Sequence, residues 1–232
     1  MSRFFAAAGR FKMEWLLAAA FGDGARLIED RQLSGEWGLG YCHGNRLELV
    51  RSPGRKTEPG LLKALLELKT DMAVIYQHEL LPESTPAGRI PPYIRYEQGR
   101  HWMFCHAGRV TRAEALFGSW QRSSGGLTTG ELLFAYVFDR FNPEQPQESL
   151  NGLLAQLAGE PELSFCLMSA DVLAFVCRTD DRGDNPARLW LGRGELIRVI
   201  CSGRVINLPG ISWEPIPSEQ VIFIRRQRWA VV

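Results

Sequence analysis

The feature of this sequence that most constrains its fold is a set of short strand-like runs joined in pairs by tight polar turns. One turn, which contains Gly44 and Asn45, lies between the runs Ser34–Tyr41 and Arg46–Arg51. A second turn, Ser-Ala-Asp, lies between Leu163–Met168 and Val172–Arg178. Runs separated by such short turns are typical of β-hairpins, whose two strands are antiparallel. We therefore expect antiparallel sheets.

Helical patterns interrupt these strands in two blocks. Leucines recur at helical spacing after Pro59, and Thr128 or Thr129 can cap a helix with Glu131 near its first turn. The expected helices cover Glu58–Thr70, Thr111–Gln121, Thr128–Phe141 and Ser149–Ala158. Further strands are expected over Met72–Leu80, Arg100–Cys105, Leu196–Cys201, Val205–Ile206, Val221–Ile224 and Trp229–Val232. Periodicity therefore predicts a mixed α and antiparallel β fold with helices outside two sheets, and we expect one domain over residues 1–232 because no linker divides the chain.

The charge balance gives no electrostatic reason to expect nucleic acid or an anionic membrane as a partner. The chain has 27 lysines and arginines against 26 acidic residues, for a net charge of +1. The small basic cluster at Arg225–Arg228 is interpreted as a polar turn between two strands. Met13–Phe21 is apolar, but it is far shorter than the roughly 20 residues of a membrane span.

Five cysteines and four histidines are candidates for thiol or metal chemistry. No two cysteines form a Cys-x-x-Cys pair, and each lies in or beside an apolar run, so we expect buried thiols in a reducing cytoplasm. His101 and His106 should face opposite sides of a strand and lack further ligands nearby. Asp180–Asp184 lacks the ligand pattern of a calcium loop and is interpreted as an exposed polar loop. Gly192–Gly194 is too short for a phosphate-binding loop, so we expect neither a metal nor a cofactor.

Four segments, taken in order, carry a family resemblance: Met1-Ser-Arg-Phe-Phe-Ala6, Glu36-Trp-Gly-Leu-Gly-Tyr41, Trp102-Met-Phe-Cys-His-Ala-Gly108 and Leu127-Thr-Thr-Gly-Glu-Leu-Leu-Phe134. Together they resemble the glutaminase domain of class II glutamine amidotransferases, above all the small stand-alone members that begin Met-Cys-Arg-Leu-Leu-Ala. The resemblance covers nearly the whole chain. It implies an α+β fold, a four-layer α-β-β-α sandwich of two antiparallel sheets, as in N-terminal-nucleophile hydrolases.

The resemblance also implies a catalytic set. In the family, the side chain of the first residue attacks the glutamine amide, and the α-amine of that residue is the base. An asparagine side chain and a glycine N–H hold the oxyanion, an arginine grips the substrate carboxylate, and an aspartate pairs with the ammonium group. These places fall here on Ser2 for the nucleophile, Ala107 and Gly108 for the oxyanion, His78 for the arginine and Thr129 for the aspartate.

The nucleophile place holds a serine where the family has cysteine. A hydroxyl nucleophile can work with an N-terminal amine, but Met1 must then be removed, which the small side chain of Ser2 permits. The alternative is that Ser2 simply begins a strand.

The three recognition places also depart from the family. Ala107 offers no side-chain donor, and the loss of one oxyanion donor lowers the turnover rate by a factor of roughly 10²–10³. The alternative interpretation of His106-Ala-Gly108 is a tight turn after a strand. The imidazole of His78 cannot form a guanidinium fork, and Thr129 carries no charge. Glu131 matches a glutamate of the family, with an expected role in helix capping.

A fifth difference lies in the loop before the oxyanion strand. The family has Asn-Thr-His-Pro-Phe there, and this chain has Arg89-Ile-Pro-Pro-Tyr93. Pro92 and Tyr93 keep the shape while the polar pair is lost. We expect side chains such as Phe4, His78 and Tyr93 to fill the pocket below Ser2.

The framework matches while the chemistry does not, which favours a protein without glutaminase activity that binds a protein partner or a small molecule. An active amidohydrolase with Ser2 as nucleophile and a substrate other than glutamine is the alternative. A third hypothesis is an amidotransferase subunit that lends its fold to a synthase complex.

Overall fold

The structure is a computed structural model that describes residues 2–21, 36–53, 58–78, 89–123, 126–160, 162–179, 187–203 and 208–226. Its described strands form two sheets in which every neighbouring pair is antiparallel. The seven-stranded sheet has the order β11 (Ser212–Pro215), β9 (Leu189–Arg193), β10 (Ile197–Ser202), β1 (Ser2–Gly9), β4 (Met72–His78), β2 (Glu36–His43) and β3 (Arg46–Ser52). The five-stranded sheet has the order β12 (Gln220–Arg225), β8 (Val172–Thr179), β7 (Glu162–Met168), β6 (Arg100–Gly108) and β5 (Tyr93–Glu97).

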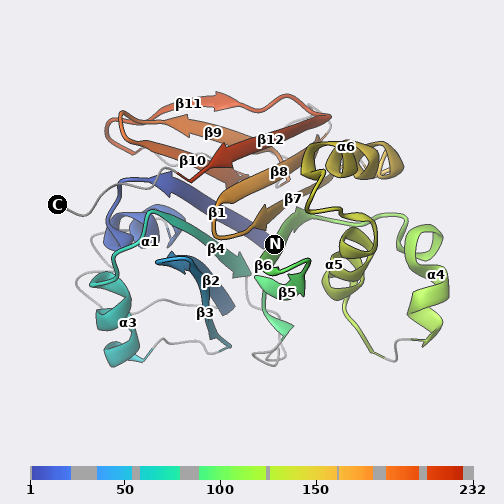
Figure 1. Cartoon of the computed structure of the whole chain (residues 1–232), viewed down its shortest axis with the longest axis horizontal. Helices are drawn as coiled ribbons and strands as arrows, with labels where there is room; N and C mark the ends of the chain where they lie inside the picture. The colour runs from blue at the N-terminus through green and yellow to red at the C-terminus, as the bar shows by residue number, and fades with distance from the viewer. Residues whose placement is uncertain are drawn as a thin grey trace.

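Alternation along the strands separates the layers. In β1, Phe4 and Ala6 belong to the apolar cluster between the sheets, whereas Phe5 and Ala7 pack with residues of α1 (Met13–Phe21) and α3 (Pro59–Leu66). This is the two-residue period of a strand that is buried on both faces. The outer face of the five-stranded sheet packs against α5 (Thr129–Arg140) and α6 (Pro146–Gln156), and α4 (Ala113–Ser123) packs on α5. Figure 1 shows these two groups of helices on opposite sides of the sheets.

The expected four-layer α-β-β-α sandwich of two antiparallel sheets is therefore confirmed. Both expected hairpins are present, as β2–β3 and β7–β8. The four expected helices correspond to α3, α4, α5 and α6, of which α6 begins earlier than expected, at Pro146. Among the described helices, none combines the length and apolar composition that crossing a membrane requires.

Three expectations lie outside the described residues. They are the strands over Val205–Ile206 and Trp229–Val232 and the loop at Asp180–Asp184. Other strands, β5, β9 and β11, were not expected from the sequence pattern.

Of the segment Arg225–Arg228, which was interpreted as a polar turn, only Arg225 and Arg226 are among the described residues. Arg225 ends β12, and Nε of the next residue, Arg226, lies 2.5 Å from Asp71 Oδ1. Its Nη1 also donates to the carbonyl oxygens of Gly44 at 2.6 Å and Ala170 at 3.1 Å. One side chain thereby joins the β2–β3 turn, the start of β4 and the β7–β8 turn.

A buried carboxylate fixes the start of α4. Glu160 is 1% exposed, and its Oε2 accepts from Thr111 N at 2.5 Å and from Thr111 Oγ1 at 2.8 Å. Its Oε1 accepts from Arg112 N at 2.9 Å. The carboxylate therefore satisfies backbone N–H groups that the helix leaves without intrahelical partners.

We predict that Glu160→Gln lowers the free energy of unfolding by about 1–3 kcal/mol, because a carboxamide replaces a charged acceptor with a donor facing an N–H group. Urea denaturation of the variant measures the change. The exposed Glu144→Gln is the matched control and should stay within about 0.5 kcal/mol of the unmodified protein. Equal stability of the two variants would contradict the role assigned to Glu160.

Candidate functional site

Three strand ends meet at one edge of the seven-stranded sheet. Ser2 is the first residue of β1 and lies opposite His78, the last residue of β4. His78 in turn lies opposite Glu36, the first residue of β2, which is 3% exposed. The structure thus brings the positions expected for the nucleophile and the arginine side by side, and it shows that Ser2 begins a strand.

Ala107 lies inside a strand. The interpretation of His106-Ala-Gly108 as a tight turn is wrong, because β6 continues to Gly108, with Ala107 opposite Ser164 and Gly108 opposite Leu163 on β7. Ala107 is 0% exposed and belongs to the apolar cluster between the sheets. A side chain with a polar amide would be buried at this position.

Gly108 is required by the backbone itself. Its φ is 87°, and a Cβ at this position would lie 1.8 Å from Glu162 O and 2.7 Å from Ala187 Cβ. The next residue, Arg109, donates its N–H to Glu162 O at 2.8 Å. Close packing at the end of the β6–β7 pair therefore explains the glycine without reference to an oxyanion.

Ser2 and Gly108 lie at the same end of the sandwich. Ser202 Oγ accepts from Phe4 N at 2.8 Å, and Ser202 lies opposite Leu189 on β9. Ala187, two residues before Leu189, is the neighbour that a Cβ at Gly108 would meet. The positions expected for the nucleophile and the oxyanion are therefore brought to a common edge.

Thr129 is the first residue of α5 and is exposed. The residue before it, Thr128, is the N-cap: its Oγ1 accepts from Glu131 N at 3.2 Å, and Glu131 Oε2 accepts from Thr128 N at 2.7 Å. This capping box confirms the expected role of Glu131. The N-terminal end of α5 is thus capped by Thr128 and Glu131. Glu131 also pairs with Arg89, whose Nε lies 3.7 Å from Glu131 Oε1.

The segment before β5 packs between the two sheets at this end. A Cβ at Gly38 would lie 2.0 Å from Pro91 O, so the segment touches β2 directly. Arg51 Nη2 donates to Pro92 O at 2.7 Å, and the Tyr93 hydroxyl donates to Arg89 O at 3.3 Å. The contact of Arg51 was not expected from the sequence, since a hydrogen bond to a backbone carbonyl of a distant loop leaves no pattern there.

Two of the side chains expected to fill the pocket are buried. Phe4 is 2% exposed in the layer between the sheets, and Tyr93 is 7% exposed in the layer under α5. A Cβ at Gly130 would lie 2.8 Å from His106 Cε1 and 3.0 Å from the Tyr93 hydroxyl oxygen. The glycine of Thr-Thr-Gly-Glu thus lets α5 approach these rings.

Burial raises the pKa of Tyr93 from 10.0 to about 12. A group whose pKa is higher in the folded state stabilises the fold fully below its unfolded pKa, and this contribution disappears as the pH rises through the folded value. For Tyr93 the loss falls between pH 10 and about 12. Burial also raises the pKa of Cys42 and Cys201 from 9.0 to about 12. The part of the stability that these thiols contribute therefore begins to decline at a lower pH than the part from Tyr93.

We predict that Tyr93→Phe flattens the decline of stability above pH 10. The measurement is the urea midpoint of the variant and the unmodified protein as a function of pH from neutral into the alkaline range. Parallel curves for the two proteins would show that Tyr93 does not titrate as a buried group. The exposed Tyr96→Phe serves as the control.

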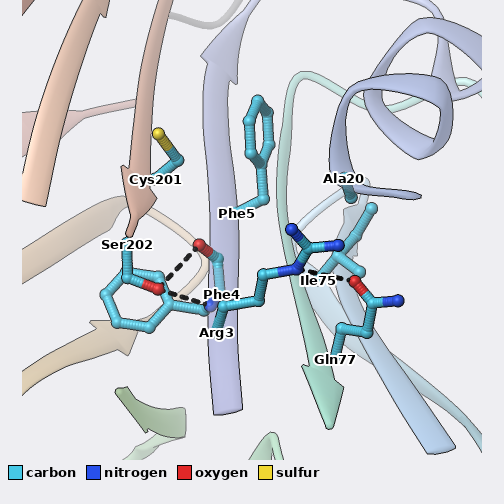
Figure 2. A pocket seen from close by; sticks show the side chains of 8 residues that line it. All are labelled: Arg3, Phe4, Phe5, Ala20, Ile75, Gln77, Cys201 and Ser202. Atoms are coloured by element: carbon cyan, nitrogen blue, oxygen red, sulfur yellow. Dashed lines mark hydrogen bonds between the residues drawn. The ribbon is translucent and has the colours of Figure 1, made fainter. Parts of the chain in front are cut away.

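A shallow hollow lies beside the start of β1, on the face toward α1. Its walls include Phe5, Ala20, Ile75 and Cys201, and Arg3 Nε donates to Gln77 Oε1 at 2.8 Å across its rim (Figure 2). The empty space is about 280 Å³ and includes open solvent. Its lining side chains offer no acid–base pair.

The histidines do not assemble a metal site within the described part of the chain, where no group of three histidine, cysteine, aspartate or glutamate side chains gathers. His101 is exposed and stacks edge-on against Tyr96, with ring centroids 5.0 Å apart. His106 lies over Phe104, with centroids 6.2 Å apart.

Solved structures show which fold this architecture matches. No protein-family model matches the sequence, and no curated protein matches it. A glutamine aminotransferase class-II domain protein from Silicibacter pomeroyi is 15% identical, with a TM-score of 0.58 over 96% of this chain and 94% of that one.

Two larger enzymes also match. The allosteric regulatory enzyme of purine biosynthesis is 13% identical with a TM-score of 0.60, and the glutamine phosphoribosylpyrophosphate amidotransferase of B. subtilis is 14% identical with a TM-score of 0.58. Each match covers 92% of this chain, which spans only about half the length of these enzymes, 48% and 49%. At these identities the likeness shows a shared fold, that of class II glutamine amidotransferase domains.

Proposed function

We propose that the protein is a class II glutamine amidotransferase-like protein that lacks glutaminase activity and acts as a binding or partner module. The observation that carries this proposal is that Ala107, the residue that the resemblance assigns to the family's oxyanion asparagine, is wholly buried in β6. A methyl group in an apolar layer cannot stabilise a developing negative charge.

The other replacements act in the same direction. Loss of one oxyanion donor costs roughly 10²–10³ in turnover, and loss of one charged partner from a buried pair costs about 2–5 kcal/mol of binding. The neutral hydroxyl of Thr129 cannot form an ion pair with an ammonium group, and the imidazole at His78 cannot bind a carboxylate through two parallel hydrogen bonds as a guanidinium does. These losses are not additive, but each weakens a different step of recognition or chemistry.

The matching framework residues have a reason to persist without catalysis, because they build the core. Trp37 is 0% exposed, Trp102 is 1% exposed, and Leu132 and Leu133 are on the buried face of α5. Selection for a stable sandwich is therefore sufficient to keep the motifs that carry the resemblance. All five cysteines are free and buried, which supports placing the protein in a reducing compartment such as the cytoplasm.

The nucleophile can be tested without knowing a substrate. Intact-mass analysis of the purified protein shows whether Met1 is retained, and a glutamine-like electrophile then tests Ser2. The proposal expects no label on Ser2. Processed protein labelled at Ser2, with labelling lost in Ser2→Ala, would instead establish the alternative, an amidohydrolase that acts on a different amide.

The partner role has a separate test. Purification under native conditions, followed by native mass spectrometry, should recover the chain with a protein or a small molecule bound. Recovery of the bare chain at every stage would count against a binding module. A synthase-like protein as the bound partner would select the subunit hypothesis.

A further inference from the structure

Sulfur is concentrated between the two sheets. Four of the five cysteines, together with Met72, Met103 and Met168, belong to the apolar cluster there, and the fifth, Cys201, lies in the cluster under α1 and α3. The cluster under α5 and α6 contains neither cysteine nor methionine among its described residues. The inner layer therefore holds most of the oxidisable sulfur of the described core.

Two of these thiols face each other across one pair of strands. Cys105 on β6 lies directly opposite Cys166 on β7, and each is 1% exposed. Directly opposite residues of antiparallel strands have Cα atoms about 4.5–5.5 Å apart, inside the range of roughly 4.4–6.8 Å that a disulfide spans. The strand register alone therefore brings these two residues within bonding range.

The other cysteines lack such a neighbour in the described strands. Cys42 lies opposite Leu47, Cys177 opposite Ser164 and Gln220, and Cys201 opposite Phe5 and Trp190. The geometry thus distinguishes one pair of thiols from three single ones.

We propose that Cys105 and Cys166 form a reversible disulfide when the protein is exposed to a peroxide. One thiol gives two electrons to the peroxide and becomes a sulfenic acid, with release of water. The sulfur of the second thiol attacks the sulfenic sulfur, the S–S bond forms, and a second water leaves with the second thiol's proton. A buried sulfenic hydroxyl has no water to bond to, so the facing thiol is its natural partner.

Burial determines how slowly this site responds. Burial raises the pKa of the Cys166 thiol, and the hydrogen bond and charge of Cys105 raise it further, so the thiolate is scarce at neutral pH. Reaction with the oxidant therefore needs local separation of β6 from β7. We expect the disulfide to form during prolonged exposure to the oxidant and not during a brief one.

The position of the pair gives the disulfide a structural consequence. On the same face of β6 and β7, the pair Ala107 and Ser164 lies next to the two cysteines in one direction along the strands. The pair Met103 and Met168 lies next to them in the opposite direction. A covalent bond at Cys105 and Cys166 would fix the spacing of the strands beside the position expected for the oxyanion.

The test first unfolds the protein, so that every thiol can react with the redox buffer before the disulfides are analysed. Protein unfolded in urea is refolded in a glutathione redox buffer, digested without reduction, and analysed for cross-linked peptides; native protein treated with hydrogen peroxide is analysed in parallel. We expect the peptide containing Cys105 to be linked to the peptide containing Cys166, with the loss of two hydrogens per chain and recovery of both thiols in dithiothreitol.

Matched variants separate this pair from nonspecific oxidation. Cys105→Ala and Cys166→Ala should each abolish the link, whereas Cys201→Ala, another buried single thiol, should keep it. In Cys105→Ala, peroxide should leave a sulfenic acid on Cys166 that dimedone traps. Refolded native-like protein in which Cys105 and Cys166 stay free thiols, or are linked no more often than Cys42 and Cys177, would overturn the proposal.

Discussion

Replacing Arg226 by alanine should lower the free energy of unfolding by about 3–5 kcal/mol, the usual cost of removing one partner from a buried ion pair. The Arg226 side chain is 9% exposed and its partner Asp71 is 21% exposed, so water screens the pair poorly. The substitution also leaves the carbonyl oxygens of Gly44 and Ala170 without this donor. Urea denaturation with the midpoint and slope fitted separately gives the change.

The neighbouring residue provides a matched control. Arg225 is exposed at the end of β12, so Arg225→Ala should change stability by no more than about 0.5 kcal/mol. Asp71→Ala should be destabilising like Arg226→Ala, and the double variant should lose less than the sum of the two. An Arg226→Ala protein as stable as Arg225→Ala would show that this side chain does not hold the sheets together.

Replacing Gly108 by alanine should cost about 2–5 kcal/mol. The left-handed φ of 87° accounts for roughly 1–2 kcal/mol of this in a residue with a side chain. The rest, about 1–3 kcal/mol, comes from forcing a methyl group into the space occupied by Glu162 O and Ala187. Thermal and urea unfolding of the variant both measure the loss.

Gly99 separates the two causes. It also has a positive φ, 81°, but a Cβ there would meet nothing within 4 Å. Gly99→Ala should therefore lose only the conformational part, roughly 1–2 kcal/mol. If Gly108→Ala were no worse than Gly99→Ala, the close approach of β6 to Glu162 would not be what requires the glycine.

Local chemistry explains which parts of the fold could be predicted from the sequence. The hairpin at Gly44 and the cap at the start of α5 are set by residues close together in the chain; the hairpin was predicted, and the expected cap, left open between Thr128 and Thr129, proved to be Thr128. Strand β5 was missed because its residues Ile94, Arg95 and Tyr96 are all exposed, so it lacks the alternation of a half-buried strand.

The missed end of β6 has a different cause. A glycine after a strand favours a turn when only neighbours in sequence are considered, yet Gly108 pairs with Leu163 on a strand far along the chain. The same limit applies to the candidate site. Sequence pattern placed His78 in a strand and Thr129 at the start of a helix, as observed, whereas the contact of Arg51 with Pro92 depends on how the two sheets are stacked.

Glutamate release from glutamine is the measurement that tests the loss of the amide-splitting groups most directly. The assay uses protein whose N-terminus has been established by intact mass, beside an active glutaminase as positive control and Ser2→Ala as a check for contaminants. We predict no glutamate release above the rate of the Ser2→Ala preparation. Saturable release by the unmodified protein that disappears in Ser2→Ala would contradict it.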